Sequence, residues 1–94
     1  MSESDYAWIV TWDHLDEKKV EVIGPSDATP EQIKELKSGV GEEFQMFDDD
    51  GILYYTGRII GDYSGFEPLD DYGEPNAGAV DIKYKNDKGE WETL

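Results

Sequence analysis

Carboxylates are the side chains with the greatest capacity for chemistry in this chain, and they are concentrated in one segment. Between Gly41 and Glu74 there are ten acidic side chains and one basic one, Arg58. The ten acids are Glu42, Glu43, Asp48, Asp49, Asp50, Asp62, Glu67, Asp70, Asp71 and Glu74. The whole chain has a formal net charge of −15 at pH 7. A field of this sign attracts metal ions and basic proteins, and it repels nucleic acid and anionic lipid.

Three consecutive carboxylates, Asp48, Asp49 and Asp50, are the first candidates for a metal site. Calcium takes about six to eight oxygen ligands, commonly carboxylates and backbone carbonyls. Three other acids could approach this group in space: Asp62, Asp70 and Asp71. The EF-hand spacing is absent, however, and Asp-Gly sequences also favour plain hairpin turns. A small divalent-cation-binding domain is therefore an alternative function, and no residue is assigned as a metal ligand.

Catalytic patterns are sparse. His14 is the single histidine, and no serine lies in a G-x-S-x-G turn. Neither a phosphate-binding Walker sequence nor a dinucleotide fingerprint occurs. Adjacent Asp70 and Asp71 would point to opposite sides in an extended chain, so they make a poor acid–base pair. We expect a non-enzymatic protein without a cofactor.

Aromatic side chains lie among the acids, which is the composition of a protein-binding surface. Aromatic anchors are favoured at the centres of interfaces and charges at their rims. The residues predicted to bind a partner are Asp48, Asp49, Asp50, Asp62, Tyr63, Phe66, Glu67, Asp70, Asp71, Tyr72 and Glu74. The expected partner is a basic protein, in particular one that binds nucleic acid. The chain would inhibit it as a phage anti-defence DNA mimic or as an immunity-type protein.

One other interpretation of the charge remains open, and another is disfavoured. A solvated acidic surface also simply keeps a small domain soluble and monomeric. Direct binding of nucleic acid is disfavoured, because phosphate contacts come from Lys and Arg, and this chain has eight of them against 23 acids. The lysines between Lys83 and Lys88 are expected to face outward from a strand and protect a sheet edge.

Length and composition predict one small folded domain over residues 1–94. Hydrophobic content is low at 37% and charged content is high at 33%, but 13% aromatic residues can build a small core. Cysteine is absent, which excludes disulfides. The acidic start, Met1 to Asp5, does not resemble a signal peptide, and no apolar run approaches membrane-spanning length. We expect a cytoplasmic protein.

The first half of the chain predicts a hairpin followed by a helix. Residues 6–12 alternate in a period of two and are rich in aromatic and β-branched types, as are residues 19–23. A turn at 14–17 would join them. Thr29 and Gln32 form a capping box around Pro30, and Gly39 supplies a left-handed stop, so a short helix is expected between them.

The second half predicts further strands around a long loop. Phe44 and Met46 begin a hairpin that turns at residues 48–51 and returns over residues 52–60. Gly57 within the returning arm suggests a bulge or a close backbone approach. Residues 80–85 alternate as a fifth strand, and residues 90–94 are a short sixth candidate. Residues 62–78 contain Gly and Pro without a clear period, and they predict a long functional loop packed on the body.

These elements together predict an α+β fold, with an antiparallel β-sheet of five to six strands and one short α-helix. The predicted core residues are Trp8, Val10, Val20, Val22, Ile33, Leu36, Phe44, Met46, Ile59, Val80 and Ile82. Three aromatic residues could belong to the core or to an interface: Tyr6, Trp12 and Tyr54.

The part of the chain from about Phe44 onward resembles a group of uncharacterised small acidic bacterial and phage-associated proteins. The specific sequences are FDDDGILYYTGRIIGD, FEPLDDYGEPNAG and IKYKNDKGEWETL. The resemblance implies a compact cytosolic domain. It implies no activity, cofactor or catalytic residue.

Overall fold

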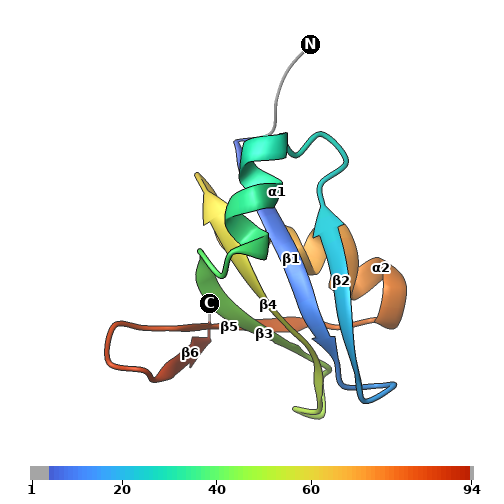
Figure 1. Cartoon of the computed structure of the whole chain (residues 1–94). Coiled ribbons are helices and arrows are strands. Elements are labelled where there is room, and N and C mark those ends of the chain that lie inside the picture. Colours follow the sequence, from blue (N-terminus) through green and yellow to red (C-terminus); the bar gives the residue numbers. More distant parts are fainter. Residues whose placement is uncertain (1–4, 94) are drawn as a thin grey trace.

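Six strands form one antiparallel sheet in the computed structural model, which describes residues 5–93. The strands are β1 (Tyr6–Asp13), β2 (Lys18–Gly24), β3 (Glu42–Phe47), β4 (Leu53–Gly61), β5 (Asp81–Lys85) and β6 (Trp91–Thr93). Their order across the sheet is β2-β1-β4-β3-β5-β6, and every neighbouring pair is antiparallel (Figure 1). The α+β class and the strand count agree with the sequence-based prediction.

Helix α1 (Pro30–Lys37) begins and ends where the sequence indicates. The Thr29 hydroxyl accepts from the Gln32 N–H at 3.2 Å, and the Gln32 side chain accepts from the Thr29 N–H at 2.8 Å. This reciprocal pair satisfies two backbone donors that the first helical turn leaves free. Gly39 has a φ of 98°, the left-handed conformation that stops the helix.

The prediction of an irregular loop over residues 62–78 is wrong for most of that segment, and with it the prediction of a single helix. A π-helical turn η1 (Leu69–Gly73) continues directly into α2 (Glu74–Ala77). Proline fits here because Pro68 and Pro75 lie at the starts of these turns, where a missing N–H is tolerated. Gly78 ends the segment with a φ of 73°. The proline and glycine residues that suggested a loop therefore lie at the ends of these helical turns.

The sheet buries side chains on both faces. One cluster contains Trp8, Val10, Phe44 and Ile59, and η1 packs on it through Leu69. The other contains Ala7, Ile9 and Ile60 from the sheet together with Leu36 from α1. Figure 1 shows α1 in front of the sheet and α2 behind it. Strand β1 is thus buried on both sides from Ala7 to Val10, which hides the alternation that one-sided burial would give.

Most of the predicted core is confirmed. Seven predicted residues are buried: Trp8, Val10, Leu36, Phe44, Met46, Ile59 and Ile82. Three are only partly buried: Val20, Val22 and Ile33. Val80 is a wrong assignment, because its side chain is 51% exposed and β5 begins one residue later. The chain leaves α2 at Gly78, and it is Ala79 that enters the core.

Gly57 marks a close approach of two strands, as its position suggested. A Cβ atom built there would lie 2.0 Å from the Ile9 carbonyl oxygen and 2.7 Å from the Phe44 ring. The irregular register lies on β1, between Val10 and Trp12, opposite this stretch of β4. Because Gly57 has no side chain, the β1 backbone and the Phe44 ring can both lie close against β4 at this position.

Candidate functional site

The Asp48–Asp50 turn contains two kinds of carboxylate. Asp48 is 9% exposed, and its Oδ1 accepts from the Asp50 N–H at 2.9 Å and the Ile52 N–H at 2.8 Å. The Ile52 N–H is the main cause of the lowered pKa of Asp48, because it stabilises the charged form. Asp49 and Asp50 are exposed. Asp48 therefore holds the turn, and the other two face solvent.

Asp71 is exposed, but its carboxylate accepts hydrogen bonds from two side chains of the sheet. Its Oδ2 accepts from the Tyr6 hydroxyl at 2.9 Å and from the Trp8 indole N–H at 3.0 Å. Desolvation and then the Asp71 hydrogen bond raise the pKa of Tyr6 to about 12. These two bonds join η1 to β1, which are more than 60 residues apart in sequence.

Glu67 is a third acid with a structural role. Its carboxylate accepts from the backbone N–H groups of Ser64 and Gly65, each at 2.8 Å. Burial opposes its charge, but these backbone donors outweigh burial, and the pKa of Glu67 is lowered. Glu67 thus orders the chain between β4 and the helical segment.

The predicted aromatic residues divide in the same way. The Tyr72 ring lies 5.6 Å from the Trp8 ring and 5.0 Å from the Tyr55 ring, so it anchors η1 on the sheet. The Tyr63 hydroxyl donates to the Glu42 carboxylate, and burial followed by this bond raises the pKa of Tyr63. Phe66, in contrast, is 45% exposed and is available as an apolar contact.

Six predicted site acids are exposed, and the five of them other than Asp71 are here called the outward acids. They are Asp49, Asp50, Asp62, Asp70 and Glu74. Within residues 5–93, none of their side chains has a hydrogen bond or an ion pair. The three ion pairs of that range join Lys18 to Asp16, Lys37 to Glu21 and Lys85 to Glu43. The described residues therefore do not neutralise the charge of the outward acids.

The structure does not gather all the predicted carboxylates into one site. Asp62 follows β4 and the Asp48–Asp50 turn precedes it, so the nine residues of β4, spanning about 27 Å, separate them. In the described part of the chain, the only group of acids with ligand atoms close enough for a metal ion is Asp48, Asp49 and Asp50, within 4.8 Å of one another. The expected approach of Asp62, Asp70 and Asp71 to this turn does not form such a group.

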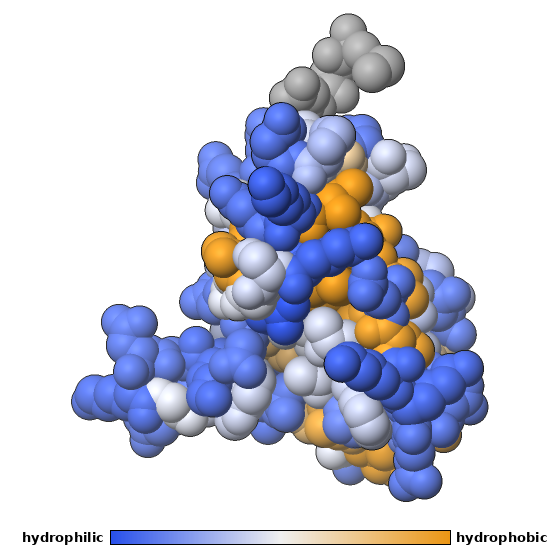
Figure 2. Space-filling view, viewed as in Figure 1, coloured by the Kyte–Doolittle hydropathy of each residue, from blue (hydrophilic) through white to orange (hydrophobic). Residues whose placement is uncertain are grey.

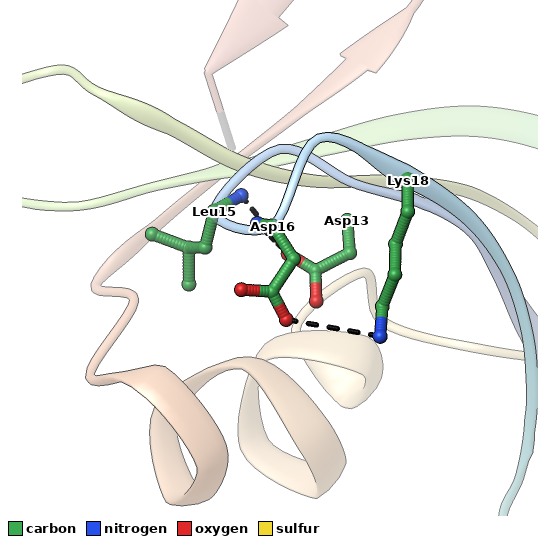
Figure 3. Close-up of polar contacts among 4 residues, drawn as sticks. All are labelled: Asp13, Leu15, Asp16 and Lys18. Carbon is green, nitrogen blue, oxygen red and sulfur yellow. Dashed lines mark hydrogen bonds and ion pairs between the residues drawn. The ribbon is translucent and has the colours of Figure 1, made fainter.

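The β1–β2 turn adds acids that the sequence analysis did not assign. The Asp13 Oδ1 accepts from the Leu15 N–H at 2.9 Å and the Asp16 N–H at 3.1 Å, and Asp16 lies 3.9 Å from Lys18 (Figure 3). Asp13 pairs with Tyr55 near the start of β4, so this turn and the β3–β4 turn lie at the same end of the sheet. Antiparallel pairing of the two predicted hairpins could have indicated this.

Helix η1 also lies close to this end. Figure 3 shows the helical segment beside the β1–β2 turn. Burial, followed by the charge of Asp13, raises the pKa of Tyr72. The end of the sheet with the β1–β2 and β3–β4 turns and the exposed side of η1–α2 are consequently neighbouring acidic regions.

His14 has a hydroxyl partner. Its Nε2 lies 2.8 Å from the Thr56 Oγ1, and its ring centroid lies 6.2 Å from that of Trp12. Burial lowers the pKa of His14, and the charge of Asp13 opposes this effect. These contacts fix the imidazole against β4.

Comparisons with known proteins found no relative. No protein-family model matches the chain, and no curated protein or solved structure is significantly similar to it. The resemblance to small acidic bacterial and phage-associated proteins stays a prediction. Among the described residues, no helix is long and apolar enough to cross a membrane.

Proposed function

We propose that this chain is a non-enzymatic acidic protein that binds and inhibits a basic, nucleic-acid-binding protein. One observation carries the proposal: the outward acids have no ion-pair partner within residues 5–93. A chain with a net charge of −15 leaves these carboxylates for external cations. Electrostatic complementarity of this kind accelerates association and selects for a partner of opposite charge.

The exposed Phe66 ring supports binding to a protein. It is 45% exposed and belongs to the same segment as Asp62 and Asp70. Large apolar anchors surrounded by charges are typical of protein interfaces. A DNA mimic would place the carboxylates where phosphates stand, and an immunity-type inhibitor would cover a basic catalytic cleft. Both forms use the same outward acids.

Capture from a lysate of the source cells tests this function. The chain is immobilised, and bound proteins are eluted first with NaCl and then, in a parallel sample, with duplex DNA. The proposal predicts recovery of one basic nucleic-acid-binding protein that both salt and DNA release. Recovery of no specific protein, or of one that DNA does not displace, contradicts the proposal and favours a merely solvated acidic surface.

A divalent-cation site at the β3–β4 turn is the second candidate function. It is favoured by the carboxylate oxygens of Asp48, Asp49 and Asp50, which lie within 4.8 Å of one another. We expect millimolar calcium to raise the melting temperature of the wild-type chain, and the double variant Asp49→Asn/Asp50→Asn to lose that rise. NaCl at the same ionic strength controls for screening. Equal shifts for both proteins, or equal shifts with calcium and with NaCl, would remove the cation site.

A further inference from the structure

The few basic residues of this acidic chain are not spread evenly. Arg58 pairs across the sheet with Ile9, and Ile9 belongs to the cluster beneath α1. Directly opposed residues of neighbouring strands share a face, so Arg58 lies on the α1 face. Lys37 reaches the same face from the last turn of α1, where it meets Glu21 of β2. This face therefore carries Arg58 and Lys37 together with two acids, Glu21 and Glu43, of which Glu43 lies opposite Arg58 on β3.

A hollow of about 240 Å³ lies in this region. Its lining residues are Ile9, Thr11, Lys19, Val20, Glu21, Lys37 and Arg58. Figure 2 looks onto the α1 side and shows apolar surface interrupted by hydrophilic side chains. The short helix leaves part of the sheet uncovered, and the hollow opens there.

The charges of the lining favour an anion. Three of the eight basic residues of the chain, Lys19, Lys37 and Arg58, line the hollow together with one acid, Glu21. Glu21 pairs with Lys37 at 3.1 Å. Lys19 has no ion-pair partner in the described part of the chain. Among the lining residues, basic side chains thus outnumber acidic ones in a protein whose net charge is −15.

Arg58 is held in place at the hollow, but one of its N–H donors has no hydrogen-bond partner. Its Nη2 donates to the Leu36 carbonyl oxygen near the end of α1. Its Nε is buried and has no hydrogen-bond partner. A buried donor without an acceptor is destabilising, and guanidinium N–H groups match the oxygens of phosphate.

We propose that the hollow binds a phosphate group, either as inorganic phosphate or as the phosphoryl group of a small metabolite. Lys19 and Lys37 supply charge, and Arg58 supplies planar donors. The apolar side chains of Ile9 and Val20 leave space beside the anion for a short carbon chain. The hollow is smaller than the pockets that hold drug-sized ligands, which run from about 300 to 1,000 Å³. This site is independent of the outward acids and of the proposed inhibitor function.

The only arginine of the chain offers a direct readout by NMR. The Nε–H signal of Arg58 is unambiguous, because no other arginine contributes. The full chain is titrated with inorganic phosphate at pH 7 against NaCl of equal ionic strength, in about 0.15 M salt, where screening weakens the field of remote acids. We expect saturable shifts of this signal and of the Thr11 and Lys19 amides. Shifts identical to those with NaCl would overturn the site.

Two substitutions locate the anion. Lys19→Gln, on an exposed part of the edge strand, should weaken phosphate binding about fivefold, the effect of losing one partly solvated charge contact. Lys34→Gln, on α1 outside the hollow, should leave the affinity unchanged. Equal affinities for both variants and wild type would refute the assignment. Ethyl phosphate distinguishes the two sources: tighter binding than phosphate assigns a metabolite, and equal binding assigns the free anion.

Discussion

Asp70 and Asp71 are neighbours in sequence with opposite roles. Both are exposed, but Asp71 accepts two hydrogen bonds from β1, whereas the Asp70 side chain accepts none from the described residues. Asp48 and Glu67 resemble Asp71, since each holds local backbone through its carboxylate. Three of the eight acids predicted to bind a partner therefore maintain the fold, and the five outward acids have no such role among the described residues.

Removal of the Asp71 carboxylate should destabilise the protein. Asp71→Ala leaves the indole N–H of the buried Trp8 without its acceptor, so we expect a loss of about 1–3 kcal/mol in the free energy of unfolding. Asp70→Ala is the matched control, with an expected change within about 0.5 kcal/mol. Denaturant unfolding followed by tryptophan fluorescence measures both. Similar values for the two variants would show that the bonds to Asp71 contribute nothing.

The sequence lists the acids, but it predicts only in part which carboxylates accept hydrogen bonds within the fold. The role of Asp48 could have been predicted, because Asp at the start of a turn often accepts from the backbone N–H two residues further on. The role of Asp71 depends on the register of the π-turn and on two aromatic residues over 60 positions away. Local pattern carries no information about such a contact.

At the scale of elements, glycine and proline have two different structural roles in this chain. Thr29, Pro30 and Gly39 delimit α1 in the expected way, since capping depends on adjacent residues. In residues 62–78 the same residue types surround a short helical segment. There is no room for a side chain at Gly73, because a Cβ atom built on it would lie 2.6 Å from the Met46 sulfur. Helices this short rely on tertiary packing, so their existence was not predictable from periodicity.

Gly57→Ala should test the packing of β4 between β1 and the Phe44 ring. The added methyl group would lie 2.0 Å from a backbone oxygen of β1, which cannot move without breaking the sheet register. We expect a loss of about 3 kcal/mol in the free energy of unfolding, the upper end of typical overpacking.

Gly51→Asn is the control for Gly57→Ala. Its site has a φ of 80° and open space around it, and Asn tolerates this conformation. The expected loss is small. If thermal and denaturant unfolding gave Gly57→Ala the stability of the control, the close approach of β1 and β4 would not constrain the fold.

At the scale of the molecule, charge is segregated. The end of the sheet with the β3–β4 turn and the η1–α2 side carry acids that have no partner among residues 5–93, while three bases line the hollow on the α1 face. The composition revealed the excess of acids, but the separation of the two signs depends on the strand order β2-β1-β4-β3-β5-β6, which no local pattern specifies.

Repulsion among like charges, in a chain with a net charge of −15, should make thermal stability depend on salt concentration. Raising NaCl from 0.01 to 0.15 M shortens the screening length from about 30 to about 8 Å, so repulsion between outward acids weakens. We expect the melting temperature to rise over this range, and to rise less for Asp49→Asn/Asp50→Asn. Calorimetry or circular dichroism measures it. A melting temperature independent of salt would mean that the acids do not repel one another appreciably.

The most direct test of the central claim is the affinity of the captured basic partner for two charge-matched variants. One replaces four outward acids, as Asp49→Asn/Asp50→Asn/Asp70→Asn/Glu74→Gln. The other removes the same charge elsewhere on the surface, as Asp27→Asn/Asp87→Asn/Glu90→Gln/Glu92→Gln.

Calorimetric titration of each variant with the partner gives the two dissociation constants. If the outward acids are the binding surface, the first variant binds at least about tenfold more weakly than the second, which stays close to wild type apart from reduced long-range steering. Equal weakening of the two variants would contradict the claim, because net charge alone would then explain the association.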